Sequence, residues 1–290
     1  MEGNKKIVLD DVLKTHDEII SDNGNPIIVN KKQRQPRTRV MGFAGDNTNP
    51  FEEKLFDEEN QIVLGGALFI LEKVFGVESD LYVDYLNNIM GIANEGMSDE
   101  VYPKDTVVCL FGVGIGGCGD SIRSVKDVNF VEREIFEMVP FRITDEELNE
   151  SEKDKYWFRQ EKEGKIHYYL KGFETKPRVK SLWKDSDDQD EDGSEVEIGV
   201  HDTSRTEPIE TFVEMILKIT KKDIREYFEM YGDIEQCRIN SIGLFTGAKR
   251  QLADGSMDYQ QVKLFSKLNI PNEMLTMKKD ITIVYRIYTN

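Results

Sequence analysis

The chain has 290 residues, of which 39% are hydrophobic, and it can bury a core without disulfides or a bound metal. Its formal net charge of −17 argues against a protein that grips nucleic acid over a broad surface, because phosphates are held by lysine and arginine. The charge is compatible with a surface past which DNA slides, since an acidic wall repels phosphate.

The cysteines and the N-terminus bear on the compartment. The three cysteines are scattered without a CxxC motif: Cys109, Cys118 and Cys237. They predict neither a disulfide framework nor a zinc site, so a reducing compartment is expected. Charges interrupt both the N-terminal segment and the longest apolar run, residues 62–77, so we expect a soluble protein without a membrane partner.

Residues 1–50 hold few core-forming residues and are expected to form an extended N-terminal arm. The candidate interaction residues are the basic side chains of this segment: Lys31, Lys32, Arg34, Arg37 and Arg39. Such a segment docks on an acidic partner or on nucleic acid, or it is a solvated linker.

Apolar residues at helical spacing predict a helix that begins near Asp57 and ends at Gly76. A second helix is expected from Ser79, and the short connection makes the two helices a near-antiparallel hairpin. Because the first helix is apolar nearly all round, its surplus face packs either in the domain core or at a subunit interface.

A buried strand is expected at residues 104–111, and it leads into a glycine-rich run that ends at Gly119. Gly112, Gly114 and Gly117 match the G-x-G-x-x-G fingerprint, whose backbone approaches a pyrophosphate. The residues that follow do not predict the amphipathic helix that this fingerprint needs. The Gly112–Gly119 segment is therefore either a phosphate-binding loop or a loop that packs closely against a neighbouring chain or turns between strands.

No metal, cofactor or catalytic site is assigned. His167 lies in a strand-like aromatic segment, and the only other histidines are His16 and His201, so no histidine cluster is available. Four residues match the first half of a calcium-binding loop: Asp188, Asp190, Asp192 and Gly193. Gly199 stands where the bidentate glutamate belongs, so a disordered or hairpin-tip acidic loop is the alternative.

The last third of the chain predicts strands at residues 211–220, 238–246 and 281–289, with a short helix at 221–231 capped by Thr220. Alternation in the last strand predicts one buried face formed by four residues: Ile281, Ile283, Tyr285 and Ile287.

Together these elements predict an α+β fold with mixed or antiparallel sheets, a helical hairpin in the N-terminal half and a C-terminal β-rich module. The expected parts are the arm at 1–50, a mixed α+β domain at 51–175, an acidic insertion at 176–206 and a C-terminal sheet module at 207–290.

Four segments resemble a family of virion structural proteins of large tailed bacteriophages. They are GVGIGGCG at 112–119, MVPFR at 138–142, DIREYFEMYGDIEQCRINSIGLFTG at 223–247 and LFSKLNIPNEMLTMKKDITIVYRIYT at 264–289. The resemblance spans most of the chain from about residue 40. It implies a structural subunit that is not an enzyme, has no cofactor, and has no catalytic residues to carry over.

The resemblance further implies a ring-forming homo-oligomer in the head–tail connector (neck or collar) or the tail, in contact with other virion proteins. DNA would at most pass through its lumen, and the protein would reside in the virion after assembly in the host cytoplasm. Two alternatives stay open. One is a nucleotide- or phosphate-binding enzyme built on the Gly112–Gly119 segment, and the other is a calcium-dependent adhesion protein built on the acidic segment.

Overall fold

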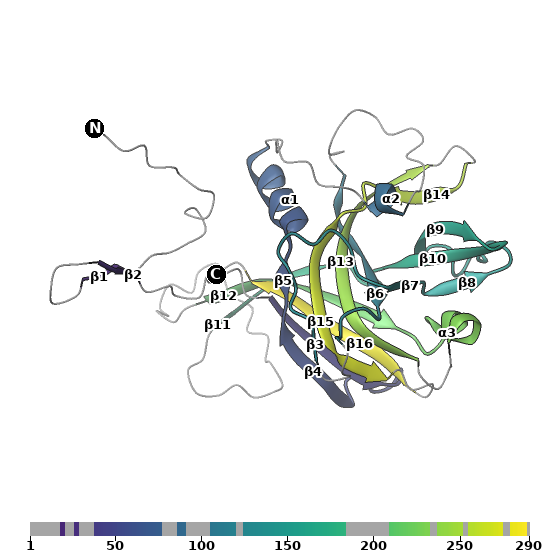
Figure 1. Ribbon diagram of the computed structural model, residues 1–290, viewed down its shortest axis with the longest axis horizontal. Coiled ribbons are helices and arrows are strands. Elements are labelled where there is room, and N and C mark those ends of the chain that lie inside the picture. Colours follow the sequence, from purple (N-terminus) through teal and green to yellow (C-terminus); the bar gives the residue numbers. More distant parts are fainter. Residues whose placement is uncertain are drawn as a thin grey trace. The chain divides into compact units, whose positions relative to one another are not determined.

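The computed structural model in Figure 1 describes residues 18–20, 26–28, 38–76, 86–90, 105–119, 124–183, 209–232, 237–251, 255–274 and 279–288. The chain divides into two compact units. The main unit comprises Thr38–Lys180 and Val213–Arg286, and the second unit comprises Met1–Arg37, Ser181–Phe212 and Ile287–Asn290. In the second unit, β1 (Glu18–Ile20) and β2 (Pro26–Ile28) form an antiparallel hairpin.

The large sheet has nine strands. They are β5 (Gln61–Ile62), β6 (Val107–Gly114), β7 (Met138–Val139), β8 (Arg142–Thr144), β9 (Tyr156–Lys162), β10 (Lys165–Gly172), β13 (Arg238–Gln251), β14 (Met257–Gln260) and β15 (Leu264–Met274). The order is β5–β15–β13–β6–β10–β8, with β14 on β13, β7 on β6 and β9 on β10. The long, curved β13 and β15 form its centre (Figure 1).

The small sheet has five strands, and its order is β11–β12–β16–β3–β4. They are β3 (Thr38–Gly45), β4 (Glu53–Glu59), β11 (Arg178–Trp183), β12 (Ile209–Ile219) and β16 (Asp280–Tyr288). The two sheets meet through a buried hydrogen bond of 2.6 Å between Ser266 Oγ of β15 and Tyr285 OH of β16. The chain passes from β4 in the small sheet to β5 in the large sheet at Asn60.

The predicted α+β fold with a helical hairpin is wrong, because two large antiparallel sheets dominate the structure. The helices among the described residues are α1 (Leu64–Phe75), the single turn α2 (Leu86–Ile89) and the short α3 (Arg225–Tyr231). Residues 77–85, where the second helix was expected to begin, lie outside the described residues. Long-range strand pairing, which leaves no local pattern, sets the fold class.

Helix α1 confirms the end of the predicted first helix and corrects its start. Gly76 adopts a left-handed conformation with φ of 64°, and its N–H donates to Glu72 O, as in an αL helix end. The predicted start at Asp57 is wrong, because Asp57 lies in β4 opposite Met41 of β3. Charged residues at a helix N-terminus and on an edge strand look alike in sequence.

Strand β13 explains why the C-terminal segments read as apolar. It lies between β15 and β6, and its residues from Ile239 to Ala248 are buried. A hydrophobic cluster fills the main unit beside it: Val63, Leu86, Leu110, Ile135, Trp157, Phe158, Tyr169, Leu170, Phe245, Val262 and Leu264. The scaffold is thus held by strands from both halves of the chain.

The strands predicted at 211–220, 238–246 and 281–289 are confirmed as β12, β13 and β16. The predicted alternation in β16 is only half right. Ile281, Ile283 and Tyr285 are buried, but Ile287 is only partly buried, and Thr282 and Val284 are also only 4% and 7% exposed. Strand β16 lies in the interior of the small sheet, so both faces of its centre are covered.

The predicted cap at Thr220 is wrong. Helix α3 begins at Arg225, and its N-cap position is Ile224, which makes no side-chain cap hydrogen bond. Ile224 has φ of 57°, a strained conformation for a β-branched residue. The Asp223 carboxylate instead accepts the Thr220 N–H at 2.6 Å. Asp223 is directed inward because it belongs to a buried ion pair.

Candidate functional site: buried polar groups and exposed edges

The glycine segment is built into the large sheet. Gly112 and Gly114 lie inside β6, where Gly112 pairs with Gly243 of β13. The N–H groups that follow are donated within the protein, from Ile115 to Glu137 O, from Gly116 to Phe136 O, from Gly117 to Asn240 Oδ1 and from Gly119 to Ser124 O. A phosphate loop needs such donors directed outward. The glycine segment is therefore packed within its own chain, against β13 and residues 136–137, and is not arranged as a phosphate-binding loop.

Two buried amides hold this segment in place. Asn240 Oδ1 accepts the Gly117 N–H at 2.7 Å, and Asn240 Nδ2 donates to Ile115 O at 2.8 Å. Asn269 accepts from Ser241 Oγ at 2.8 Å and donates to Lys126 O at 3.0 Å. The polar residues of β13 and β15 thus satisfy backbone groups where β6 leaves the sheet.

A buried ion pair links the sheets of the main unit. Lys171 Nζ of β10 lies 2.8 Å from Asp223 Oδ2, and the two side chains are 1% and 0% exposed. Lys171 also donates to Lys218 O at 2.8 Å, and Tyr156 OH donates to Asp223 Oδ1 at 2.6 Å. Burial, together with the Asp223 carboxylate, raises the pKa of Tyr156 well above its usual range. These groups are closed to solvent, so they support structure and are not placed to meet a substrate.

Arg142, from the MVPFR segment, extends this network towards the surface. Its guanidinium donates to Glu226 at 3.0 Å and to Glu152 at 2.9 Å, and it lies 5.6 Å from the centre of the Tyr156 ring. Burial raises the pKa of Glu226 in spite of this partner. Arg142 therefore joins α3, β8 and the turn before β9.

Thiols and His167 are built into the interior. Burial raises the pKa of Cys109 to about 12 and that of Cys237 to about 11, so both thiols stay protonated at neutral pH. His167 is 2% exposed in β10, where its ring stacks 6.2 Å from that of Tyr169, and burial lowers its pKa. It is a strand residue, as the sequence predicts.

In the part of the chain that the structure describes, no group of three or more His, Cys, Asp and Glu side chains could hold a metal ion. No helix in that part is long and apolar enough to cross a membrane. The predicted calcium-loop residues Asp188, Asp190, Asp192 and Gly193 lie outside the described residues.

Arg39 is the one basic candidate that the structure describes, and it belongs to β3. Its guanidinium makes two hydrogen bonds to the Asp57 carboxylate, at 2.9 and 2.8 Å. Lys54 Nζ lies 2.6 Å from the same carboxylate. Arg39 is the main cause that holds the pKa of Asp57 well below its usual range. The other four candidates, Lys31, Lys32, Arg34 and Arg37, lie outside the described residues.

The small sheet ends in two edges of opposite charge. At one end β4 carries Glu53, Asp57, Glu58 and Glu59 against a single lysine, and Glu58 and Glu59 are exposed. At the other end Arg178, the first residue of β11, and Lys176, two residues before it, are exposed, while Lys180 pairs with Glu214 at 2.8 Å. Each of these strands has one neighbour in the sheet as described. Sequence reasoning missed this pattern because which strands are edges depends on the topology.

Helix α1 packs on β15 through two glycines. A Cβ at Gly65 would lie 2.7 Å from Leu264 O, and one at Gly66 would lie 2.0 Å from Phe265 O. The opposite face of α1 is apolar and exposed: Ile70 by 36%, Leu71 by 47%, Val74 by 69% and Phe75 by 69%. The surplus apolar face predicted from the sequence is therefore directed away from the core.

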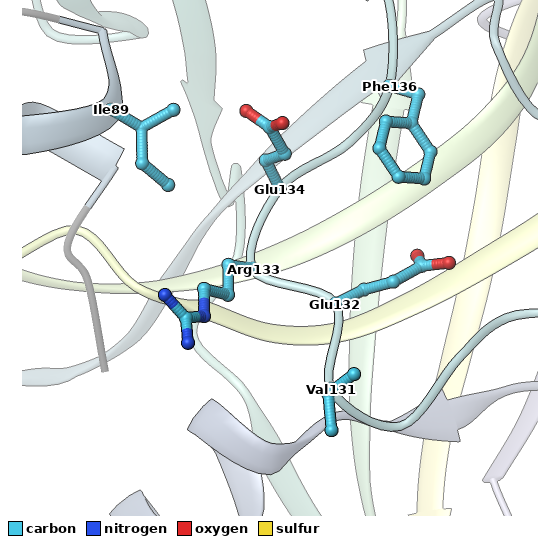
Figure 2. Close-up of a pocket in the computed structure, with 6 residues that line it drawn as sticks. All are labelled: Ile89, Val131, Glu132, Arg133, Glu134 and Phe136. Carbon is cyan, nitrogen blue, oxygen red and sulfur yellow. The ribbon is translucent and has the colours of Figure 1, made fainter. Parts of the chain in front are cut away.

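A shallow pocket of about 390 Å³ lies beside α2. Figure 2 shows Val131, Glu132, Arg133, Glu134 and Phe136 along one segment, with Ile89 of α2 opposite them. Two of its lining residues make structural contacts. Glu132 forms an ion pair of 2.5 Å with Lys267, and Lys267 Nζ lies 4.1 Å from the centre of the Phe136 ring. The described residues that line this pocket therefore do not form a recognisable catalytic arrangement.

Comparison with protein-family models, with curated proteins and with solved structures finds no match.

Proposed function

We propose that this chain is a structural subunit of a tailed-bacteriophage particle, and not an enzyme. It would assemble into a ring with copies of itself in the head–tail connector (neck or collar) or in the tail. Other virion proteins would contact the ring, and DNA would at most pass through its lumen.

The observation that carries this proposal is where the phage-like segments lie. The segment 223–247 supplies α3 and most of β13, and the segment 264–289 supplies β15 and β16. The segments 112–119 and 138–142 supply the end of β6, β7 and the start of β8. The resembling segments thus lie in strands that build both sheets. Similarity in such strands is typical of a shared fold and not of a shared exposed loop.

Two further features support an assembled state. The outward face of α1 exposes four large apolar side chains, and contiguous apolar surface of this kind is typical of interaction sites. The net charge of −17 suits a wall that DNA passes without binding, because like charges repel.

The proposal is tested by electron microscopy and sedimentation velocity of the purified full-length protein. We expect closed rings or short stacks of rings. A Val74→Glu/Phe75→Glu variant should assemble less well if α1 contacts another chain. Glu146→Lys, an exposed change on the turn after β8, serves as a control that should assemble like the parent.

A protein that stays monomeric at all concentrations would contradict the ring. Mass spectrometry of purified particles from the phage that encodes the sequence tests the virion assignment separately, because the chain should then be present in many copies per particle.

A further inference from the structure

We propose that copies of this chain join edge to edge, with β4 of one copy placed beside β11 of the next, so that the small sheet continues from subunit to subunit. The inference rests on the proposed function in one respect, namely that the chain assembles with copies of itself. The occupant of each edge is therefore a second copy of the same protein.

An edge strand presents backbone N–H and C=O groups that have no partner within the sheet, and these groups template pairing with another strand. In the small sheet, β4 and β11 are the two end strands of the described order. Strand β4 spans Glu53–Glu59 and β11 spans Arg178–Trp183, so their lengths are similar. Pro177 has no N–H, which restricts pairing to β11 itself.

Glu58 and Glu59 are exposed on β4, Arg178 is exposed at the start of β11, and Lys176 is exposed two residues before that strand. Two copies of β4 placed together would oppose carboxylates, and two copies of β11 would oppose cations, so both like pairings are disfavoured. Pairing β4 with β11 brings opposite charges together. The charges therefore select one of the three possible edge contacts.

A contact between two different edges is heterologous, so each copy still offers one vacant edge of each kind after pairing. Such contacts propagate until the rotation between neighbours closes a ring, and otherwise they form an open filament. The opposite charges of the two edges thus fit a ring-forming subunit better than a two-fold dimer.

The test uses charge reversal in the full-length protein. One variant carries Glu58→Lys/Glu59→Lys, and a second carries Lys176→Glu/Arg178→Glu. We expect each variant alone to associate at least about tenfold more weakly in sedimentation velocity, because opposed like charges cost more than about 1.4 kcal/mol. Each variant changes only two exposed side chains of one edge. Exposed substitutions of this kind should leave the midpoint of unfolding nearly unaltered.

Restoring assembly with complementary variants distinguishes edge pairing from any other cause of weakened assembly. An equimolar mixture of the two variants should co-assemble, because each then offers the edge that complements the other. A chain that carries all four reversals should assemble by itself like the parent. An Asp145→Lys/Glu146→Lys variant, which makes the same change in charge away from both edges, should also assemble like the parent.

The outcomes separate the inference from the proposed function. If the parent assembles and the single-edge variants assemble equally well, edge pairing is overturned while the ring proposal stands. If assembly is lost in those variants and neither the mixture nor the fourfold reversal restores it, edge pairing is again overturned. A parent that never assembles overturns both.

Discussion

The buried Asp223 carboxylate has a structural role, in an ion pair with Lys171. Asp223 accepts from Lys171, from Tyr156 and from the Thr220 N–H, so both of its oxygens have partners. Removing one member of a buried pair leaves an uncompensated charge, which costs far more than the pair itself contributes. The pair therefore constrains how β10 and the turn before α3 meet.

We expect Asp223→Ala to lower the free energy of unfolding by about 3–5 kcal/mol, because the Lys171 ammonium is then buried without its counter-ion. Denaturant-induced unfolding measures this loss. Glu229→Ala is the matched control, since Glu229 pairs with Arg225 on the surface, where the side chains are 45% and 47% exposed. Its cost should stay below about 1 kcal/mol. Equal losses for the two variants would refute the assignment.

His167 should make stability depend on pH. Burial lowers its pKa in the folded protein, so the unfolded chain, with a pKa of about 6.5, binds the proton more readily. Stability should therefore fall as pH drops below about 6.5. In His167→Phe this contribution disappears, and the free energy of unfolding should change less between about pH 7.5 and 5. If the free energy of unfolding changed with pH in the same way in the parent and in His167→Phe, His167 would not be the cause of the pH dependence. Lys162 and Glu163, whose charges act on the ring, are present in both proteins.

The sequence indicated that Asp223 and His167 lie at structured positions, but it did not indicate their partners. Lys171 is 52 residues from Asp223, and nothing in the local pattern links them. The cap spacing from Thr220 to Asp223 was real, yet the hydrogen bond runs from the Thr220 backbone to the Asp223 side chain. Local chemistry thus identified the residue, and only the fold identified its role.

Strand β16 is buried on both faces at its centre. Ile283 is 0% exposed, and Ile283→Ala should cost about 2–5 kcal/mol through lost burial and a cavity. Thr282 is only 4% exposed, so Thr282→Ala should also cost about 1 kcal/mol and not be neutral, as alternation alone would suggest. Thermal and denaturant unfolding measure both losses. A neutral Thr282→Ala would show that this face is open in solution.

The glycine segment allows a comparison within one motif. A Cβ at Gly117 would lie 2.1 Å from the backbone oxygen of Asn240, so Gly117→Ala must displace β13 or β6 and should cost about 1–3 kcal/mol or more. At Gly119 the nearest atom is Ser124 Oγ at 3.3 Å, so Gly119→Ala should be much milder. Unfolding measurements on the two variants test this order. The reverse order would indicate that the segment is not packed against Asn240.

Element positions were largely predictable, and element partners were not. The strands at 211–220, 238–246 and 281–289 follow from β-branched and aromatic runs, and the end of α1 follows from Gly76. The acidic run at Asp57 carries the same signal for a helix start and for a charged edge strand. Deciding between them requires β3, which pairs with this acidic run in unbroken register from Arg39 to Met41.

For the whole molecule, the contacts that set the architecture lie far apart in sequence. Strand β13 pairs with β6 through partners such as Ser241 and Gly114, and β15 pairs with β5 through Ser266 and Ile62. No periodicity encodes which strands meet, so composition indicated a folded chain but not two antiparallel sheets. The opposite charges of β4 and β11 acquire meaning only once the strand order is known.

The N-terminal segment can be removed at a boundary that the structure defines. Strand β3 begins at Thr38, where the main unit also begins, so deleting residues 1–37 keeps β3 and its pairing with β4 in the small sheet. We expect the truncated protein to unfold cooperatively with a nearly unchanged midpoint, and to assemble less well than the full chain. The reason is charge, because the deleted segment carries four of the candidate basic residues while the whole chain has a net charge of −17.

A full-length variant tests whether charge is the cause. Replacing Lys31, Lys32, Arg34 and Arg37 by glutamine keeps the length of the segment and removes its positive charge. If the segment docks on the acidic surface of a neighbouring copy, this variant should assemble as poorly as the truncated protein. Raising the salt concentration should then also weaken the assembly of the parent, because salt screens the attraction. If both altered proteins sediment as the parent does, the segment is a linker, and assembly depends on the main unit alone.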